Sequence, residues 1–520
     1  MQPVPKRART TVSAPDALET LDPDQREAVK MVDAGHNVLL YGGPGSGKSH
    51  TLRVIIARLR ARHQRGVLVA APTGVAALLV DGQTMHSKPG PGVPTGCTKS
   101  FKFMQQGLSK AMWSALKVLV IDEISMVDAE FLDWYTAAGL QGRKIQVVLC
   151  GDFAQLPPVP NKGGGLANDE LLARCRRASD ASKDPWQTTP FGLDECSGRY
   201  AFQTATWRRL NLKVALLTGA HRTTDDALLA ALTDIRVGAG DTPTVSRLLE
   251  LTTRPLAAVD GVMPTRLFSR RADVQQHNEA ALARLDPGSH RSYDAHDAAE
   301  PADLQSDSFF KECPAASRLA LRVGAQVMLV QNEPVGGPLP RLVNGSRGVV
   351  IGFAPLASDE KTSKTGAQKS ATQPIEYPVV RFLGGREETI GPKAFKKELY
   401  MRGEVARMQV PLALAWALTV HKSQGASIDL LTVDLNGAFA DGQAYVAISR
   451  ASRLEGLQIV NFAPELIHAN PIIVEFEAAM KAGCLAEFVA TIPPWWASIL
   501  EHPGWAALFR RHPVFCGLIG

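Results

Sequence analysis

The sequence predicts an α/β fold built on parallel sheets. Four near-continuous apolar runs, at residues 38–41, 67–71, 118–121 and 147–150, alternate with segments of helical spacing. Such runs are typical of strands that are buried on both faces of a parallel sheet. Each run ends in glycine-rich or polar residues. Because ligands bind outside the carboxyl ends of parallel strands, we expect these polar clusters to converge on one crevice.

The first cluster, residues 42–49, reads Gly-Gly-Pro-Gly-Ser-Gly-Lys-Ser and fits the phosphate-binding pattern G-x-x-x-x-G-K-[ST]. Its glycines let backbone N–H groups close on phosphate oxygens, and the helix that follows adds a favourable dipole. Lys48 is expected to reach the β- and γ-phosphates, and Ser49 to ligate Mg²⁺. The predicted nucleotide-binding residues here are Gly42, Gly43, Pro44, Gly45, Ser46, Gly47, Lys48, Ser49 and His50.

Two further strand ends carry hydrolytic chemistry. Asp122 and Glu123 follow the third run. Asp122 is expected to hold Mg²⁺ and Glu123 to polarise the attacking water. Gln155, in the segment 151–158 after the fourth run, is placed to contact the γ-phosphate and the water and to report hydrolysis to a neighbouring domain. The alternatives are a helix-capping pair and an ordinary strand-to-loop turn.

Three more residues are candidates for nucleotide contact. Gln25 lies at the start of a predicted helix and can pair with an adenine edge, although Asp22 and Pro23 also indicate a helix cap there. Arg222 and Arg450 lie far along the chain. An arginine brought across a domain cleft stabilises the charge that develops on a γ-phosphoryl group. Taken alone, either arginine fits a surface salt bridge equally well.

The composition describes a multidomain protein. A chain of 520 residues is too long for one core, and 45% of its residues are hydrophobic. No apolar run reaches the roughly 18 residues that indicate a membrane span. The seven cysteines form no C-x-x-C pair, which argues against zinc and a disulfide framework and fits a reducing compartment. The net charge of +6 permits nucleic-acid binding.

The first residues of the sequence are basic. Lys6, Arg7 and Arg9 precede the first acidic residue, Asp16. This cluster fits a nuclear import signal, the start of a transit peptide, or a solvated tail. The expected location is therefore the nucleus or the mitochondrion, and the choice between them stays open.

The chain divides by composition into six segments. We predict a surface insertion at about 160–200. The second α/β domain is predicted to contain strands at 265–268, 431–433 and 457–460. Short strands at 327–330, 348–351 and 377–382 indicate a β-rich insertion, which contains a polar loop at 358–373. The predicted segments are a disordered basic tail 1–20, a first α/β domain 21–213, the first part of a second α/β domain 214–319, the β-rich insertion 320–405, the second part of that domain 406–462, and a C-terminal helical tail 463–520.

Taken in order, these pieces resemble a superfamily-one helicase, and within that class the Pif-type (petite integration frequency) family of the branch that moves 5′→3′. The resemblance covers about residues 21–462. The segments that carry it are 121–126, 151–159, 342–348, 415–425 and 445–450.

The resemblance implies a fold and an ATP site. It implies two RecA-like parallel-sheet domains of the P-loop NTPase type, with ATP and Mg²⁺ between them. It also implies a small wedge insertion at about 88–112 in the first domain, and a Src-homology-3-like β-barrel within 320–405 in the second. Carried over by motif, Gln25 contacts adenine, while Gln155, Arg222 and Arg450 sense or stabilise the γ-phosphate.

The resemblance also implies a path for single-stranded DNA across both domains. Hydroxyls, backbone N–H groups and a lysine can hold phosphates without reading base sequence, and a histidine can stack on a base. Either histidine is equally well explained as a packed structural residue. The implied DNA contacts are Pro72, Thr73, Gly74, Thr84, His86, His421, Lys422 and Ser423.

Two departures from the family pattern stand out. Arg222 is followed by Thr223, where the family usually has glutamine, so the role of that glutamine is missing here. Residues 136–143 carry no basic residue before Arg143, whereas relatives usually carry basic residues earlier in this helix, which weakens the case for DNA contact there. The core ATPase residues are all present, so we expect an active enzyme.

The expected function is ATP-driven translocation on single-stranded DNA, with unwinding of forked or tailed duplexes by a protein that is monomeric when free and has no membrane partner. DNA replication, repair, recombination, and telomere or organelle genome maintenance are all compatible. Two alternatives remain: an RNA-directed helicase of the same superfamily, and a nucleotide-dependent DNA-binding module that does not unwind.

Overall fold

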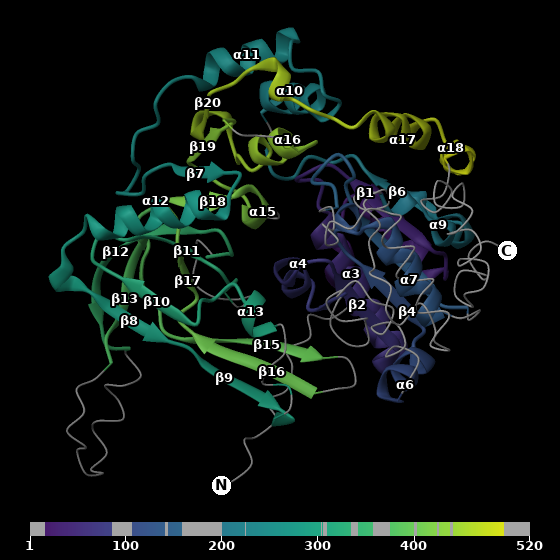
Figure 1. Cartoon of the computed structure of the whole chain (residues 1–520), viewed down its shortest axis with the longest axis horizontal. Helices are drawn as coiled ribbons and strands as arrows, with labels where there is room; N and C mark the ends of the chain where they lie inside the picture. The colour runs from purple at the N-terminus through teal and green to yellow at the C-terminus, as the bar shows by residue number, and fades with distance from the viewer. Residues whose placement is uncertain are drawn as a thin grey trace, which may run out of the picture.

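The computed structural model shows two parallel sheets and an antiparallel β-rich lobe (Figure 1). Structure is described here for residues 16–85, 107–140, 144–158, 200–223, 225–302, 304, 309–333, 342–356, 375–399, 403–423, 426–436 and 440–492.

The first sheet has six parallel strands in the order β3-β2-β4-β5-β1-β6. It contains all four apolar runs of the sequence, which confirms the parallel-sheet prediction. Consecutive strands cross over within the sheet, so the polar segments after β1, β4 and β5 end at the same edge. The strands are β1 Val38–Gly42, β2 Val67–Ala71, β3 Gln83–Thr84, β4 Val118–Ile121, β5 Gln146–Gly151 and β6 Lys213–Leu217.

Helices cover both faces of this sheet, and alternate residues of β1 show it. Val38 and Leu40 belong to the core cluster that includes buried residues of α2 and α3, whereas Leu39 and Tyr41 belong to the cluster on the other face. Burial on both faces explains why the strands are apolar throughout. The helices are α1 Asp16–Glu19, α2 Pro23–Asp33, α3 Lys48–His63, α4 Gly74–Leu79, α6 Gly107–Ala115, α7 Ala129–Leu140 and α9 Ala205–Leu210.

The second sheet has four parallel strands in the order β18-β7-β19-β20. Three of them match the predicted strands at 265–268, 431–433 and 457–460. The strands are β7 Thr265–Phe268, β18 Ala417–Thr419, β19 Leu431–Asp434 and β20 Leu457–Val460; the helices around them are α10 Asp226–Arg236, α11 Pro243–Thr252, α12 Arg271–Ala283, α15 Val420–Ser423 and α16 Gln443–Ile448.

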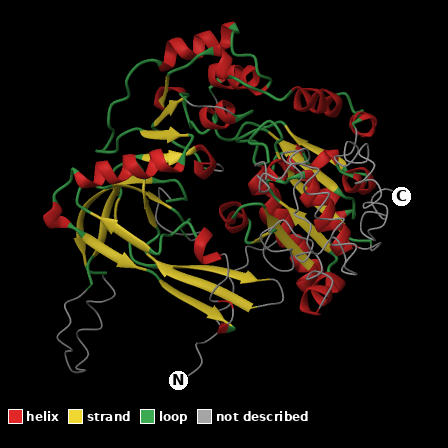
Figure 2. Cartoon of the chain, viewed as in Figure 1, coloured by secondary structure: helices red, strands yellow, loops and turns green. Residues whose placement is uncertain are grey.

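The β-rich lobe is inserted between β7 and β18 and consists mainly of strands (Figure 2). Its sheets, β14-β13-β12-β11-β17, β15-β16-β9 and β10-β8, are antiparallel and run from Arg291 to Leu414, so the lobe is wider than the predicted 320–405. Its elements are β8 Arg291–Asp294, β9 His296–Glu300, α13 Phe309–Glu312, β10 Arg318–Leu321, β11 Gln326–Leu329, β12 Arg347–Ala354, β13 Tyr377–Phe382, β14 Glu387–Thr389, β15 Lys393–Leu399, β16 Gly403–Gln409 and β17 Leu412–Leu414.

The domain boundary predicted at 213/214 is wrong. It falls inside β6, whose residues pair in parallel with β1 from Val38 to Gly42. The first sheet therefore continues through Leu217. The error has a physical cause: an apolar strand at a sheet edge has the same local pattern whether it closes one domain or opens the next.

The C-terminal segment packs against the first domain. Its helices are α17 Pro471–Lys481 and α18 Leu485–Thr491, and α18 contacts α9. Phe476 of α17 is fully buried, with its ring centroid 4.6 Å from that of Phe202 and 5.1 Å from that of Phe153. The helical tail predicted at 463–520 is thus helical over these stretches, and its first long helix belongs to the core.

Several predictions fall outside the described residues. They are most of the wedge at 88–112, nearly all of the insertion at 160–200, the loop at 358–373, most of the tail 1–20, and the end of the C-terminal tail from 493 to 520. Among the helices that the structure describes, none has both the length and the apolar character needed to cross a bilayer.

Replacing Phe476 by alanine should lower the free energy of unfolding by about 3–5 kcal/mol, because it removes a fully buried ring from the aromatic cluster. Chemical denaturation followed by circular dichroism measures the change. Glu475→Ala, an exposed position on the same helix, is the control and should stay within about 0.5 kcal/mol. A Phe476→Ala value no larger than that of the control would contradict the packing of α17.

Candidate nucleotide-binding cleft

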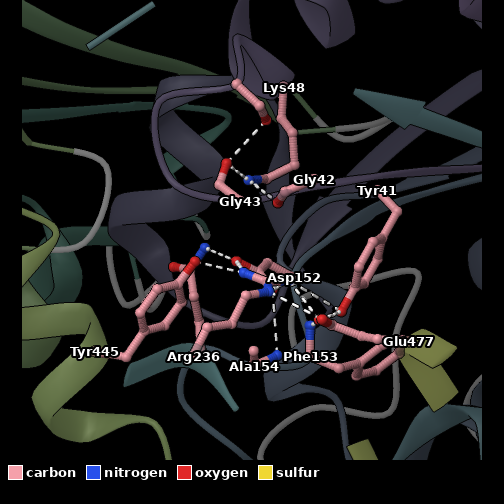
Figure 3. Close-up of polar contacts among 12 residues, drawn as sticks. Tyr41, Gly42, Gly43, Lys48, Asp152, Phe153, Ala154, Arg236, Tyr445 and Glu477 are labelled. Atoms are coloured by element: carbon pink, nitrogen blue, oxygen red, sulfur yellow. Dashed lines mark hydrogen bonds and ion pairs between the residues drawn. The ribbon is translucent and has the colours of Figure 1, made fainter. Parts of the chain in front are cut away.

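The phosphate-binding loop joins β1 to α3. Gly45 and Gly47 have φ of +82° and +84°, a left-handed conformation that favours glycine. The Lys48 ammonium donates hydrogen bonds to the carbonyl oxygens of Gly42 (2.6 Å) and Gly43 (2.9 Å), as Figure 3 shows. Burial lowers the pKa of Lys48. Among the described residues this half-buried ammonium donates only to neutral carbonyl oxygens, so it is suited to receive phosphate oxygens.

Gln25 lies over the same loop. A Cβ on Gly47 would come within 2.2 Å of the Gln25 amide nitrogen, so only glycine fits beneath it. Gln25 is also the third residue of a capping box: its backbone N–H donates to Asp22, and its side chain accepts from the Asp22 N–H. The capping role is therefore confirmed. The amide nitrogen, 3.4 Å from His221 Nε2, is the atom left to contact a base.

Asp122 and Glu123 extend from the end of β4 toward this loop. Glu123 has φ +52° and ψ +47°, a left-handed conformation that is rare for a residue with a side chain and is found most often at functional sites. A Cβ on Gly151 would come within 2.9 Å of Ile124, so this glycine permits the close approach of the segments after β4 and β5. Both carboxylates are thereby held near the phosphate loop.

The two carboxylates suit a divalent cation. Burial raises the pKa of Asp122, and burial together with the neighbouring Asp122 raises the pKa of Glu123 to about 7. Two adjacent buried acids are costly to ionise, and a hard cation with oxygen ligands would relieve that cost. Ser49 lies in the first turn of α3 and is exposed. Asp122 and Ser49 are thus the residues that fit Mg²⁺.

Arg222 and Arg450, which are 228 residues apart in the sequence, both lie at the cleft. Arg222 follows β6 and lies against the loop, with its Cβ 2.7 Å from where a Cβ on Gly45 would stand. Its guanidinium donates to the carbonyl oxygen of Ser449 (2.8 Å). Arg450 follows α16, is almost fully buried, and donates to the Val446 carbonyl oxygen and the Ser449 hydroxyl.

The charges of these two arginines are poorly compensated. Burial lowers the pKa of Arg222 to about 10, and burial followed by the nearby Arg222 lowers the pKa of Arg450 to about 9. Within the described part of the chain, their hydrogen-bond acceptors are neutral. Two neighbouring guanidinium groups that donate only to neutral acceptors among the described residues, one of them against the phosphate loop, are suited to a group with several negative charges.

Arg236 is a cleft residue that sequence reasoning missed. Gln155 donates to Asp152 (3.0 Å), and Asp152 forms a two-pronged ion pair with Arg236 at the end of α10, with distances of 2.6 and 2.9 Å (Figure 3). Burial alone would raise the pKa of Asp152, but the Arg236 guanidinium holds it below its ordinary value. The sequence offered only one signal, an arginine at the end of an amphipathic helix.

The same guanidinium contacts two further groups. It donates to Glu477 of α17, with the Nε–Oε2 distance 3.0 Å, and to the Tyr445 hydroxyl of α16. The Tyr41 hydroxyl of β1 donates to Glu477 at 2.7 Å. Glu477 is 6% exposed. In the sequence, the only signal for this contact is that Glu477 lies within the largely apolar segment 472–480.

The predicted DNA contacts lie on both sides of the cleft. Pro72 and Thr73 follow β2 and are half-buried, and the Thr73 hydroxyl accepts from the Ala76 N–H at the start of α4. Thr84, Gly74 and Ser423 are buried, and the Ser423 hydroxyl donates to the Val420 carbonyl oxygen. His86 and the side chains of His421 and Lys422 lie outside what the structure describes.

A phosphate loop, a carboxylate that fits a divalent cation, a candidate general base and two arginines, set between two parallel sheets, are typical of a nucleoside triphosphatase of the two-domain motor class. Family models match the chain as "PIF1-like helicase" over residues 20–176 and as "DNA helicase Pif1, 2B domain" over residues 307–353. The ATP-dependent DNA helicase PIF1 of Xenopus laevis is 34% identical over 92% of this chain and 68% of its own length. The chain belongs to the PIF1-like family of ATP-dependent DNA helicases.

Solved structures agree with this assignment. Pif1 helicase from Candida albicans has a TM-score of 0.63 and 30% identity over 88% of this chain and 99% of its own. Pif1 from Bacteroides sp in complex with ADP-AlF4 has a TM-score of 0.65 and 25% identity over 89% and 97%. The Bacteroides protein bound to ssDNA gives a TM-score of 0.53 over the same shares. The chain spans about two thirds of the length of the curated relatives it matches.

Replacing Lys48 by alanine should abolish DNA-stimulated ATP hydrolysis, because the ammonium is the only cation that the loop itself supplies to the phosphates. Phosphate release in the presence of single-stranded DNA measures the effect. Lys30→Ala is the control, because Lys30 is exposed on α2 and pairs only with Glu27 among the described residues. Undiminished hydrolysis in Lys48→Ala would reject the site.

Proposed function

We propose that this protein is an ATP-dependent 5′→3′ DNA helicase that translocates on single-stranded DNA and unwinds forked or tailed duplexes. The observation that carries the proposal is the pair Arg222, half-buried against the phosphate loop, and Arg450, buried behind it, which among the described residues donate only to neutral acceptors. Such an arrangement binds a triphosphate far better when the two domains are closed. Nucleotide binding and domain closure are then one event.

The chemistry of hydrolysis follows from the residues in the cleft. Lys48 and the loop N–H groups would hold the phosphates, and Glu123 would orient and deprotonate the attacking water. Ser49 and Asp122 would hold Mg²⁺, which would neutralise part of the phosphate charge. Gln155 would contact the water and the γ-phosphate, and Arg222 and Arg450 would stabilise the charge that develops there. Gln25 and His221 would face the base.

Close contacts couple this chemistry to domain movement. A Cβ on Gly442, at the start of α16, would come within 2.4 Å of the Ala154 carbonyl oxygen and 2.5 Å of the Gln155 carbonyl oxygen. The second domain therefore lies directly on the segment that would sense the γ-phosphate. Loss of the γ-phosphate removes the anion between the arginines and the loop, so the cleft opens. The two domains can then alternate in which of them holds the DNA tightly.

The proposed DNA path crosses α4, the 83–84 strand and α15. In this structure β15 contacts β3, and α13 contacts α4, so the β-rich lobe reaches over the first-domain part of that path. The lobe's five-stranded antiparallel sheet supports a Src-homology-3-like insertion, and we propose that the wedge lies near 88–112. Burial of Thr84 and Ser423 implies that the lobe and domains shift when DNA enters.

The biological setting is proposed more broadly. We infer action on nuclear or mitochondrial DNA, in replication, repair, recombination or telomere maintenance, by a chain that is monomeric when free. The relatives PIF1 of Homo sapiens and RRM3 of Saccharomyces cerevisiae are named as ATP-dependent DNA helicases, which supports action on DNA.

A strand-displacement assay should show unwinding of a duplex with a 5′ single-stranded tail and little unwinding of the same duplex with a 3′ tail. Release of a labelled strand in the presence of ATP and Mg²⁺ measures this. Glu123→Gln is the matched control: it keeps the shape of the side chain and removes the base, so displacement should stop while nucleotide binding persists.

Each other outcome of that assay rejects part of the proposal. Unwinding only of 3′-tailed substrates would reject the direction. Unwinding of matched RNA substrates alone would favour an RNA-directed helicase. ATP-dependent binding of DNA without strand release would favour a binding module.

A further inference from the structure

Arg236 is the most heavily bonded cation in the cleft, and the chemistry of hydrolysis described above does not use it. Its guanidinium donates to Asp152, Glu477 and the Tyr445 hydroxyl, and its Nη2 lies 3.4 Å from the Tyr41 hydroxyl. Its side chain is 14% exposed, and those of Asp152 and Glu477 are 0% and 6% exposed. We call these five residues the Arg236 network (Figure 3).

The network joins three separate parts of the chain. Tyr41 and Asp152 end strands of the first sheet, Arg236 and Tyr445 lie on helices α10 and α16 of the second domain, and Glu477 lies on α17. In Figure 1, α17 lies above the β1 and β6 end of the first sheet and to the right of α10 and α16. The network is therefore an ionic link across the cleft.

Arg236 differs from the other two cleft arginines in how its charge is compensated. Burial lowers the pKa of Arg222 and Arg450, which have neutral acceptors. Burial also opposes the charge of Arg236, but Asp152 and the groups around it hold its pKa well above its usual range. Arg222 and Arg450 are thus available to an incoming anion, whereas Arg236 already has two carboxylates. Its role is to hold protein groups in place.

The groups that Arg236 holds adjoin two parts of the proposed phosphate site, Gln155 and the phosphate loop. Asp152 accepts a hydrogen bond from the Gln155 amide (3.0 Å), so the ion pair sets the orientation of that amide. A Cβ built on Gly43 would lie 3.4 Å from the Tyr445 hydroxyl and 3.6 Å from Arg236 Nη1. The network therefore also packs against the phosphate loop. Lys48 is bonded to the Gly43 carbonyl oxygen.

We propose that Arg236 is a positioning residue for ATP hydrolysis, and that Glu477 of the C-terminal helix sets its geometry. Asp152 and Glu477 hold the two edges of one guanidinium, so a change at Glu477 is transmitted through Arg236 and Asp152 to Gln155. The C-terminal helix thereby becomes a part of the ATPase. The proposal rests on the proposed function.

The variants are chosen so that folding does not decide the result. Removing Arg236 outright would leave two buried carboxylates unpaired and is strongly destabilising. Glu477→Gln keeps the shape and one acceptor. Arg236→Lys keeps the charge but loses the two-pronged geometry, since an ammonium cannot replace the planar fork. Glu475→Gln, exposed on the same helix, and Arg247→Lys, in an exposed pair with Glu250, are the matched controls.

Two measurements are made on each variant of the full chain. The first is kcat and KM for DNA-stimulated ATP hydrolysis. The kcat should fall about tenfold or more in Arg236→Lys and by a smaller factor in Glu477→Gln, with KM within about twofold, because a misplaced Gln155 affects the transition state rather than binding. The second is affinity for ADP with and without aluminium fluoride. Affinity for ADP should be unchanged, and affinity for ADP–aluminium fluoride should fall by about the same factor as kcat.

A purely structural network would give a different result. Equal losses of affinity for ADP and for ADP–aluminium fluoride, or a kcat of Glu477→Gln equal to that of Glu475→Gln, would overturn the proposal. If Arg236→Lys does not fold, Glu477→Gln decides alone. An unmodified chain without ATPase activity would reject the proposed function instead, and the two affinities would still test the network.

Discussion

The buried ion pair between Arg236 and Asp152 is the interaction on which the arrangement of the cleft depends. It joins α10 of the second domain to the end of β5 in the first, and Glu477 of α17 completes it from a third direction. Removing charges from water is costly, so such a pair persists only when its hydrogen bonds are all made. Here every nitrogen of the guanidinium has an acceptor, which makes the relative position of the three segments specific.

The cleft therefore holds three arginines of two kinds. One is satisfied by protein carboxylates and fixes geometry. Among the described residues, the other two, Arg222 and Arg450, donate only to neutral acceptors, so their charge is available to an anion. Near them, burial raises the pKa values of Asp122 and Glu123, which makes both carboxylates costly to ionise unless a cation binds beside them. A nucleoside triphosphate with a divalent cation would supply an anion to the arginines and a cation to the carboxylates at once. This is how we propose that domain closure is coupled to catalysis.

Local signals were sufficient to predict much of this protein from the sequence. The strands of the first sheet are apolar throughout because both faces are covered, and the phosphate loop is recognisable because its glycines adopt conformations that other residues avoid. The boundary at 213/214 failed because β6 resembles any other strand. The 320–405 insertion was drawn too narrow because β8 and β9 are mostly exposed and carry little apolar pattern.

By itself, the sequence determined the fold class and the family, and it predicts the residues that would contact phosphate, metal and water. Those features reside in short segments whose chemistry is readable without neighbours. Tertiary structure alone decided which arginine is paired and which is free, and that α17 belongs to the nucleotide cleft. Tyr41 and Glu477 are 436 residues apart in the chain, and burial of a charge is a property of everything packed around it.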